Sequence, residues 1–282
     1  VGDVDQYCAT FELDRVGPEV DARRGAFGRA GGVVEAEEGE AAALGAARYV
    51  HAAFFGAGIL AAYLSGKLVL AGWNMLADWP GFSIIENVIT DAECVRLLDA
   101  LSAADGRAGV RNLMANDEVS ALARDGRLTA IVEGILGGPV IPYKATLFSK
   151  TGKANWLVAW HQDTALPVEE FREAPGWGPV SVKDGVTFAH APASALSNVV
   201  ALRLHLDQST ERNGPLRVIP DSHHRRLTAE EIDAIVSDRE PKMCTVDRGG
   251  VIAMSPLLVH ASSKCVDGSQ PRRVLHIEYV ES

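Results

Sequence analysis

AWHQDTALPV, residues 159–168, is the stretch of sequence that decides the fold. One residue separates His161 from Asp163, and alternate residues of a β-strand point to the same side, so this imidazole and this carboxylate face the same way. His260, in the later stretch LLVHASSK, offers a third ligand. Two histidines and one carboxylate on one face of a metal ion leave coordination positions open, as non-haem Fe(II) oxygenases require.

The sequence between and after these residues predicts further strands. NVVALRLHLDQSTERNGPLRVIPDSH, residues 198–223, predicts two strands joined in a hairpin by a turn at Asn213 and Gly214. A second turn, at Asp267 and Gly268, leads into the last strand, RRVLHIEYV. An arginine that enters the cavity from this strand binds a carboxylate through two parallel hydrogen bonds, as a dicarboxylate cosubstrate needs.

Four motifs in this order, WHQD, NGPLRVIPDSH, VHASSK and PRRVLHIEY, together resemble the phytanoyl-CoA dioxygenase family. The similarity extends over about residues 80 to 282 and includes ENVITDAECVRLLDAL and KATLFSKTGKANW. The resemblance implies a mainly β fold with flanking helices, a double-stranded β-helix of the jelly-roll or cupin type. It also implies a dioxygenase that uses Fe(II), 2-oxoglutarate and O2 to hydroxylate a C–H bond of a small-molecule substrate, with release of succinate and CO2.

The resemblance also implies roles for particular residues. Those that match the iron ligands are His161, Asp163 and His260, and those that match the 2-oxoglutarate site are Arg272, Ser262 and Trp177. Arg272 matches the arginine that holds the distal carboxylate of 2-oxoglutarate. Arg273 is a rival, because the distance from His260 is one residue longer than the family pattern, and strand alternation alone does not decide between the two arginines.

Two further positions bear on the resemblance. The family usually has glycine where Asp221 stands, and aspartate tolerates the left-handed backbone of such a turn better than most residues do. Asp163 stands where a small residue would leave a vacant metal position for halide, so hydroxylation is favoured over halogenation. We expect ascorbate to support turnover in vitro.

A protein of another class remains an alternative: a jelly-roll module that binds a metal or a small ligand without turnover. The arginine of the last strand and the complete ligand set favour the enzyme. Gln162 alternates to the opposite side of its strand from the two ligands, so we expect a structural role for it. We expect Lys144 to be an ordinary solvated lysine. The substrate cannot be derived from the sequence, since specificity depends on loops such as residues 164–197.

Composition excludes some partners. The formal net charge of -10 and a pI near 5.3, without a basic run, argue against nucleic acid. Four scattered cysteines, Cys8, Cys94, Cys244 and Cys265, lack the CxxC spacing of a zinc site and suit a reducing cytoplasmic location, with packing as their role. The oligomeric state does not follow from the sequence.

The first 74 residues differ in composition from the remainder. We expect residues 1–74 to be a low-complexity Gly/Ala-rich extension that is disordered or is non-native sequence upstream of a start at Met75, and residues 75–282 to form the dioxygenase domain. The fifteen uncharged residues 52–66 fall short of the roughly twenty that a membrane-spanning helix needs, so a membrane anchor is not expected.

Helix signals are clear from residue 90 onward. Thr90 with Glu93, and Thr228 with Glu231, form capping-box patterns, and the first of these predicts a helix that buries Val95, Leu98 and Leu101. Asn116 is placed to cap another helix. A further apolar pattern from Leu128 to Leu136 ends at Gly137.

Overall fold

The computed structural model of this protein describes residues 49–51, 60–64, 67–70, 79–102, 107–151, 154–183, 185–266 and 270–282. Within the first 74 residues, β1 (Tyr49–His51), β2 (Leu60–Leu64) and β3 (Lys67–Leu70) form a three-stranded antiparallel sheet. Cys8, Met75 and the turn at Asp267 and Gly268 lie outside the described residues, and the domain boundary at residue 74 stays a prediction. Among the described residues, no helix has the length and apolar character to cross a membrane.

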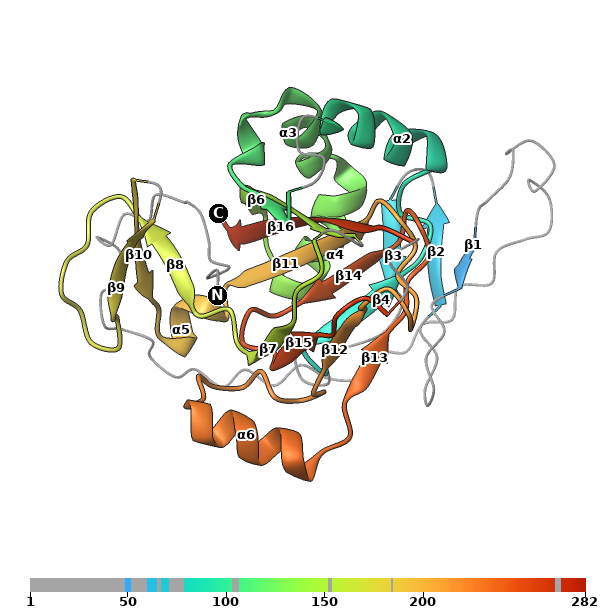
Figure 1. The fold of residues 1–282 in the computed structure, drawn as a ribbon. Coiled ribbons are helices and arrows are strands. Elements are labelled where there is room, and N and C mark those ends of the chain that lie inside the picture. Colours follow the sequence, from blue (N-terminus) through green and yellow to red (C-terminus); the bar gives the residue numbers. More distant parts are fainter. Residues whose placement is uncertain are drawn as a thin grey trace, which may run out of the picture.

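Two antiparallel sheets form the body of the molecule (Figure 1). The larger sheet has the strand order β4-β14-β11-β16-β6-β5 and the smaller has the order β13-β12-β15-β7. The strands of the larger sheet are β4 (Phe82–Ile85), β5 (Gly109–Val110), β6 (Val140–Lys150), β11 (Val199–His205), β14 (Val251–Met254) and β16 (Arg272–Glu281). Those of the smaller are β7 (Val158–His161), β12 (Leu216–Val218), β13 (Lys242–Cys244) and β15 (His260–Ser262). This arrangement is the predicted jelly roll.

Strand alternation divides the core into two layers. On β11, Val200, Leu202 and Leu204 face α2 (Asp91–Ala100), α3 (Asp117–Ala123) and α4 (Gly126–Leu136), which cover the outer face of the larger sheet in Figure 1. Ala201 of the same strand faces the smaller sheet and packs with Leu216. The space between the sheets therefore receives every second residue of β11, and it is this space that holds the site.

Additional elements flank the two sheets. The short 3-10 helix η3 (Leu113–Ala115) precedes α3. The helix α6 (Ala229–Asp238) packs on the outer face of the smaller sheet, where its Ile232 contacts the cluster that contains Val259. β8 (Ala165–Val168), β9 (Val180–Lys183) and β10 (Val186–His190) form their own three-stranded sheet, followed by α5 (Ala193–Leu196). Residues 164–197 thus build a separate lobe beside the two-sheet body (Figure 1).

The predicted helix ends are confirmed. Thr90 and Thr228 each form a complete capping box, and Asn116 Oδ1 accepts a hydrogen bond from Val119 N at 3.1 Å. Gly137 ends α4 in the left-handed conformation, with φ of 85°. Asp221 also has a left-handed φ, of 59°, so aspartate does adopt the turn conformation in which glycine was expected.

Two local predictions are wrong. β11 and β12 do not form a hairpin at Asn213 and Gly214, because β11 pairs with β14 and β16 while β12 pairs with β13 and β15. The connection instead carries the chain from one sheet to the other. Val95 of α2 is 47% exposed, and the buried face of that helix is formed by Cys94, Leu97 and Leu101.

We expect Gly249→Ala to destabilise the fold. Gly249 has φ of 82°, its N–H donates to His205 O at 2.8 Å, and a Cβ there would collide with the carbonyl oxygen of Ile89. The left-handed backbone alone costs about 1–2 kcal/mol for a residue with a side chain, and the collision adds to this. Chemical denaturation measures the loss. Gly126→Ala is the matched control, because a Cβ there meets nothing within 4 Å, and an equal loss in both variants would contradict the prediction.

His205 at the end of β11 makes stability depend on pH. Its side chain is buried between the sheets, and burial followed by repulsion from Arg272 lowers the pKa of His205 to about 3. In the unfolded chain the pKa lies near 6.5, so between about pH 6.5 and 3 the unfolded state binds the extra proton and acid weakens folding.

Replacing this imidazole should reduce the acid sensitivity of the fold. One proton of difference changes the free energy of unfolding by about 1.4 kcal/mol per pH unit, so His205→Leu should lower the pH slope between pH 6 and 4 by about that amount. Urea denaturation of the metal-free protein across this range gives the slope. The same change at the exposed His224 is the control, and an unaltered slope in His205→Leu would refute the assignment.

Candidate metal centre

Three potential metal ligands converge at one end of the smaller sheet. His161 is the last residue of β7 and His260 is the first of β15, and the antiparallel pairing of these strands sets His260 opposite His161. Asp163 follows β7 in a loop that is fixed by a hydrogen bond from Asp163 N to Pro256 O, 2.8 Å long. Residues far apart in the sequence are thus brought together by strand register.

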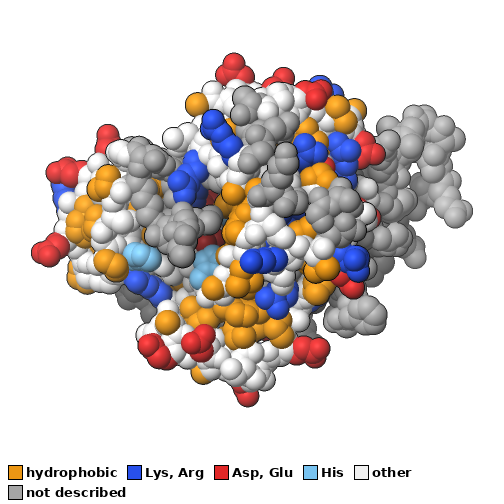
Figure 2. All heavy atoms as spheres, viewed as in Figure 1, with side chains coloured by type: hydrophobic (Ala, Val, Ile, Leu, Met, Phe, Trp, Pro, Cys, Tyr) orange, Lys and Arg blue, Asp and Glu red, His pale blue; other side chains and the backbone are white. Residues whose placement is uncertain are grey.

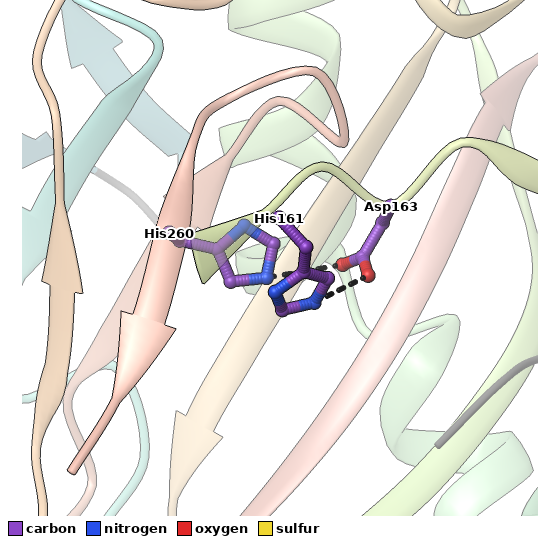
Figure 3. A group of neighbouring side chains, drawn as sticks. All are labelled: His161, Asp163 and His260. Atoms are coloured by element: carbon purple, nitrogen blue, oxygen red, sulfur yellow. Dashed lines mark ion pairs between the residues drawn. The ribbon is translucent and has the colours of Figure 1, made fainter. Parts of the chain in front are cut away.

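The three side chains point toward one another (Figure 3). Asp163 Oδ1 lies 3.3 Å from His161 Nε2, and Asp163 Oδ2 lies 3.4 Å from His260 Nε2. One ligand atom from each residue lies within 4.8 Å of the other two. These three residues are the one group of this kind among the described residues.

Hydrogen bonds fix both imidazoles in the tautomer that binds a metal. Nδ1 of His161 lies 2.8 Å from Ala159 O, and Nδ1 of His260 lies 2.8 Å from Leu258 O. A carbonyl oxygen only accepts, so each Nδ1 carries a hydrogen and each Nε2 can offer its lone pair to a metal. Backbone carbonyls play this orienting role behind the histidine ligands of metal sites.

The electrostatic state of the three groups also suits a cation. Burial, and then His161, lower the pKa of His260 to about 3, so this imidazole is neutral at pH 7. Burial alone would raise the pKa of Asp163, but His260 and His161 hold it well below its ordinary range. The donor set is two imidazole nitrogens and one carboxylate oxygen, which fits Fe(II) with open coordination positions.

One side of the group is open to solvent. The His260 side chain is 4% exposed, whereas those of Asp163 and His161 are 27% and 35% exposed. Figure 2 shows histidine side chains at the surface where the β8–β10 lobe meets the two-sheet body. A small molecule therefore has access to the ligands from this side.

A second polar group lies deeper between the sheets, around Ser262. Arg272 Nη2 donates to Ser262 Oγ at 3.2 Å, Lys150 Nζ donates to the same oxygen at 2.7 Å, and Ser262 Oγ donates to Gly214 O at 2.9 Å. Arg272 and Lys150 are both almost fully buried. Arg272 Nε and Nη1 have no hydrogen-bond partner among the described atoms. The donors left over fit an incoming carboxylate.

Lys150 is a residue that the sequence analysis missed. Burial and the neighbouring Arg272 lower the pKa of Lys150 to about 7, and strand register places the two residues opposite each other on β6 and β16. Lys150 shares a face of its strand with Lys144, and nothing in the sequence around the two lysines indicates that either is buried. Lys144 itself is not solvated as expected: it is buried and forms an ion pair of 2.6 Å with Glu278.

Arg273 faces away from this group. Its Nε and Nη2 donate to the two carboxylate oxygens of Asp207 at 2.7 and 2.9 Å. The neighbouring arginines at the start of β16 therefore lie in different surroundings, one against Ser262 and one in an ion pair on the other face. This geometry favours Arg272 over Arg273 as a ligand-binding residue.

Trp177 and Gln162 have other surroundings. Trp177 packs against an apolar cluster that includes Leu166, Leu196 and Leu257. Gln162 is buried on the opposite side of its strand from the ligands, where Nε2 donates to Arg225 O at 2.9 Å and Oε1 accepts from Leu227 N at 2.8 Å. The structural role expected for Gln162 is confirmed.

Solved structures with the same fold are known. AviO1 from Streptomyces viridochromogenes Tue57 matches with a TM-score of 0.53 and 22% identity over 72% of this chain and 90% of that one. EctD from S. alaskensis, solved with 2-oxoglutarate and 5-hydroxyectoine, matches with a TM-score of 0.54 and 19% identity over 72% of this chain and 73% of that one. At this level of identity the likeness establishes the jelly-roll fold.

Sequence comparison identifies the family. A curated relative, the L-proline trans-4-hydroxylase of Streptomyces griseoviridis, is 26% identical over 191 residues, which cover 58% of this chain and 63% of the relative. The chain thus spans less than two thirds of the length of that relative. The family model for phytanoyl-CoA dioxygenase (PhyH) matches residues 78–274. Because this match covers more than half of the chain and includes all three potential metal ligands, the chain belongs to the phytanoyl-CoA dioxygenase family.

Proposed function

We propose that this protein is an Fe(II)- and 2-oxoglutarate-dependent dioxygenase that hydroxylates a C–H bond of a small-molecule substrate and releases succinate and CO2. The observation that carries the proposal is the pairing of an open-sided metal-ligand group with a buried cationic group that has unused donors. Family membership supports the same reaction. The second group is not needed by a module that binds only a metal.

In this proposal, His161, Asp163 and His260 hold the iron. When bound, the iron supplies the activation of O2 with electrons from 2-oxoglutarate. The chain holds both imidazoles by their Nδ1 hydrogen bonds, so that the Nε2 atoms and the Asp163 carboxylate meet on one side of the ion. The other side stays open for cosubstrate, O2 and substrate.

Arg272 holds the distal carboxylate of 2-oxoglutarate through its unpartnered Nε and Nη1, with Ser262 beside it. Lys150 adds positive charge there, while its Nζ donates to Ser262 Oγ, Ser262 O and Ser263 O. Arg272 lies on β16 and Ser262 lies on β15, the strand that begins with His260. The same strand therefore contributes a residue to the cosubstrate site and a ligand to the metal site. The buried residues around Arg272, Ser262 and Lys150 exclude water from the site of the distal carboxylate. Trp177 remains a proposed member of the cosubstrate pocket, on the apolar side formed with Leu166 and Leu196.

The location and the substrate complete the proposal. We propose a cytoplasmic location, which the burial of Cys94 and Cys244 as thiols supports. The partner is a small molecule, as for the hydroxylase of proline and for EctD, which was solved with 5-hydroxyectoine. Residues 164–197, which form the lobe beside the open side, supply the specificity contacts.

The metal site is tested by turnover and metal content together. Purified protein given Fe(II), 2-oxoglutarate, O2 and ascorbate should form succinate slowly even without substrate, and His161→Ala should lose both bound Fe(II) and succinate, because one of the three ligands is gone. Metal analysis and succinate assay measure the two. His224→Ala, at an exposed histidine, is the control. Retained Fe(II) in His161→Ala would place the metal elsewhere, and absence of succinate from iron-loaded wild type would favour the binding module.

The two arginines of β16 give a matched pair for the cosubstrate site. Arg272→Gln should raise the KM for 2-oxoglutarate about 10- to 100-fold, the equivalent of roughly 1.4–3 kcal/mol, because it removes charged hydrogen bonds from a buried carboxylate. Arg273→Gln should leave the KM unchanged and lower stability by about 1 kcal/mol, because the ion pair with Asp207 is lost. The reverse pattern would make Arg273 the anchor.

A further inference from the structure

Arg203 is a buried arginine that neither of the two groups already described uses. It lies on β11, and alternation turns it away from Leu202 and Leu204, which pack against the helices, and into the space between the sheets. It is 7% exposed. Strand pairing sets it beside His276 of β16, on the layer that faces the metal ligands.

The guanidinium of Arg203 is incompletely paired. Its Nη1 donates to His276 Nδ1 at 3.2 Å, and its Cζ lies 5.5 Å from the centre of the Phe148 ring. Nε has no hydrogen-bond partner, and no carboxylate of the described residues forms an ion pair with Arg203. A buried cation without a counter-ion is costly, so an anion that reached it would be held strongly.

The buried carboxylate of Glu278 is linked to Arg203 through His276, but it is already paired with other donors. Since Arg203 donates to Nδ1 of His276, Nε2 of that ring carries the hydrogen and donates to Glu278 Oε1 at 3.0 Å. Lys144 Nζ donates to the same oxygen at 2.6 Å, and Tyr143 Oη donates to Oε2 at 2.7 Å. Lys144 balances the charge of Glu278. The chain of hydrogen bonds therefore fixes Arg203 in place without neutralising it.

The other charges between the sheets are also assigned. Asp163 is a metal ligand, and Arg272 with Lys150 faces the distal carboxylate of the cosubstrate. Arg203 lies close enough to the metal ligands that Asp163 raises its pKa, although burial has the larger effect and lowers it. Arg203 in turn contributes to the lowered pKa of His260, after burial and His161. One positive charge beside the metal ligands is thus left for a further anion.

We propose that Arg203 binds an anionic group of the substrate, a carboxylate in the simplest case, so that the substrate is an organic acid. This inference rests on the proposed function and adds the substrate class to it. Tyr143 contacts Glu278 on one side and packs against the apolar cluster of Leu166, Leu257 and Trp177 on the other. The acid group of the substrate therefore binds Arg203, and its carbon skeleton packs against this apolar cluster.

The test compares carboxylates with their neutral amides. Acetate, cyclopentanecarboxylate and benzoate, each against its primary amide, are titrated by calorimetry into the anaerobic full chain loaded with Fe(II) and 2-oxoglutarate. At least one carboxylate should bind wild type about tenfold or more tightly than its amide, because a charge-assisted bidentate pair is lost in the amide. Arg203→Gln, which keeps a donor for His276, should bind the two alike, and Arg203→Lys should keep part of the preference.

A matched control is available on the neighbouring sheet. Arg217 stacks on Trp160, with Cζ 5.0 Å from the ring, and Arg217→Gln should keep the full preference for carboxylates. No preference in wild type, or a preference that survives in Arg203→Gln, would overturn the proposal. Thermal unfolding of each variant confirms that it is folded before the titration, and if Arg203→Gln does not fold, Arg203→Lys decides: an undiminished preference there would overturn the proposal.

A separate titration distinguishes the two sources of a carboxylate. The visible charge-transfer absorption of the anaerobic Fe(II) complex reports 2-oxoglutarate binding, which Arg203→Gln should leave within about twofold of wild type while Arg272→Gln weakens it about tenfold or more. Equal losses would mean that Arg203 binds the cosubstrate, and would overturn the substrate assignment. Carboxylate preference without succinate formation would refute the proposed function alone, and succinate formation without carboxylate preference would refute only this inference.

Discussion

The antiparallel register between β7 and β15 is the constraint on which the rest of the site depends. It sets His161 beside His260, and the loop that follows β7 then brings Asp163 to both rings. A shift of one residue would turn one histidine to the opposite face of the sheet and remove it from the group. The two halves of the ligand set are therefore held together by backbone pairing more than by any contact between the side chains.

Local features of this fold were readable from the sequence because local chemistry determines them. The capping residues Thr90, Asn116 and Thr228 each satisfy a backbone N–H within their own first turn, and the structure confirms all three. The spacing of His161 and Asp163 is local in the same sense. His260, by contrast, could be identified as the third ligand only from four motifs in the order of a known family. The sequence of one strand does not indicate which other strand pairs with it.

Long-range features were missed for the same reason. Asn213 and Gly214 are typical of a hairpin, yet the strands on either side find partners elsewhere, because competition among strands decides pairing and a turn does not. Lys144 was expected to be an ordinary solvated lysine, and Lys150 was not singled out. Both lysines are buried because other strands and helices pack over β6. The residues next to them in the sequence do not indicate this packing. A buried cation is visible only after the fold is known.

Gln162 shows that the metal ligands are also held from behind. Its amide contacts the backbone at Arg225 and Leu227, in the stretch that leads to α6, and also the carbonyl of Leu257, shortly before His260. The side chain of Gln162 thus links three segments: the end of the strand that carries His161, the residues before His260, and the residues before α6. The position of a helix on the surface is mechanically linked to coordination geometry in the interior, so damage to that geometry can originate at a residue that never meets metal, cosubstrate or substrate.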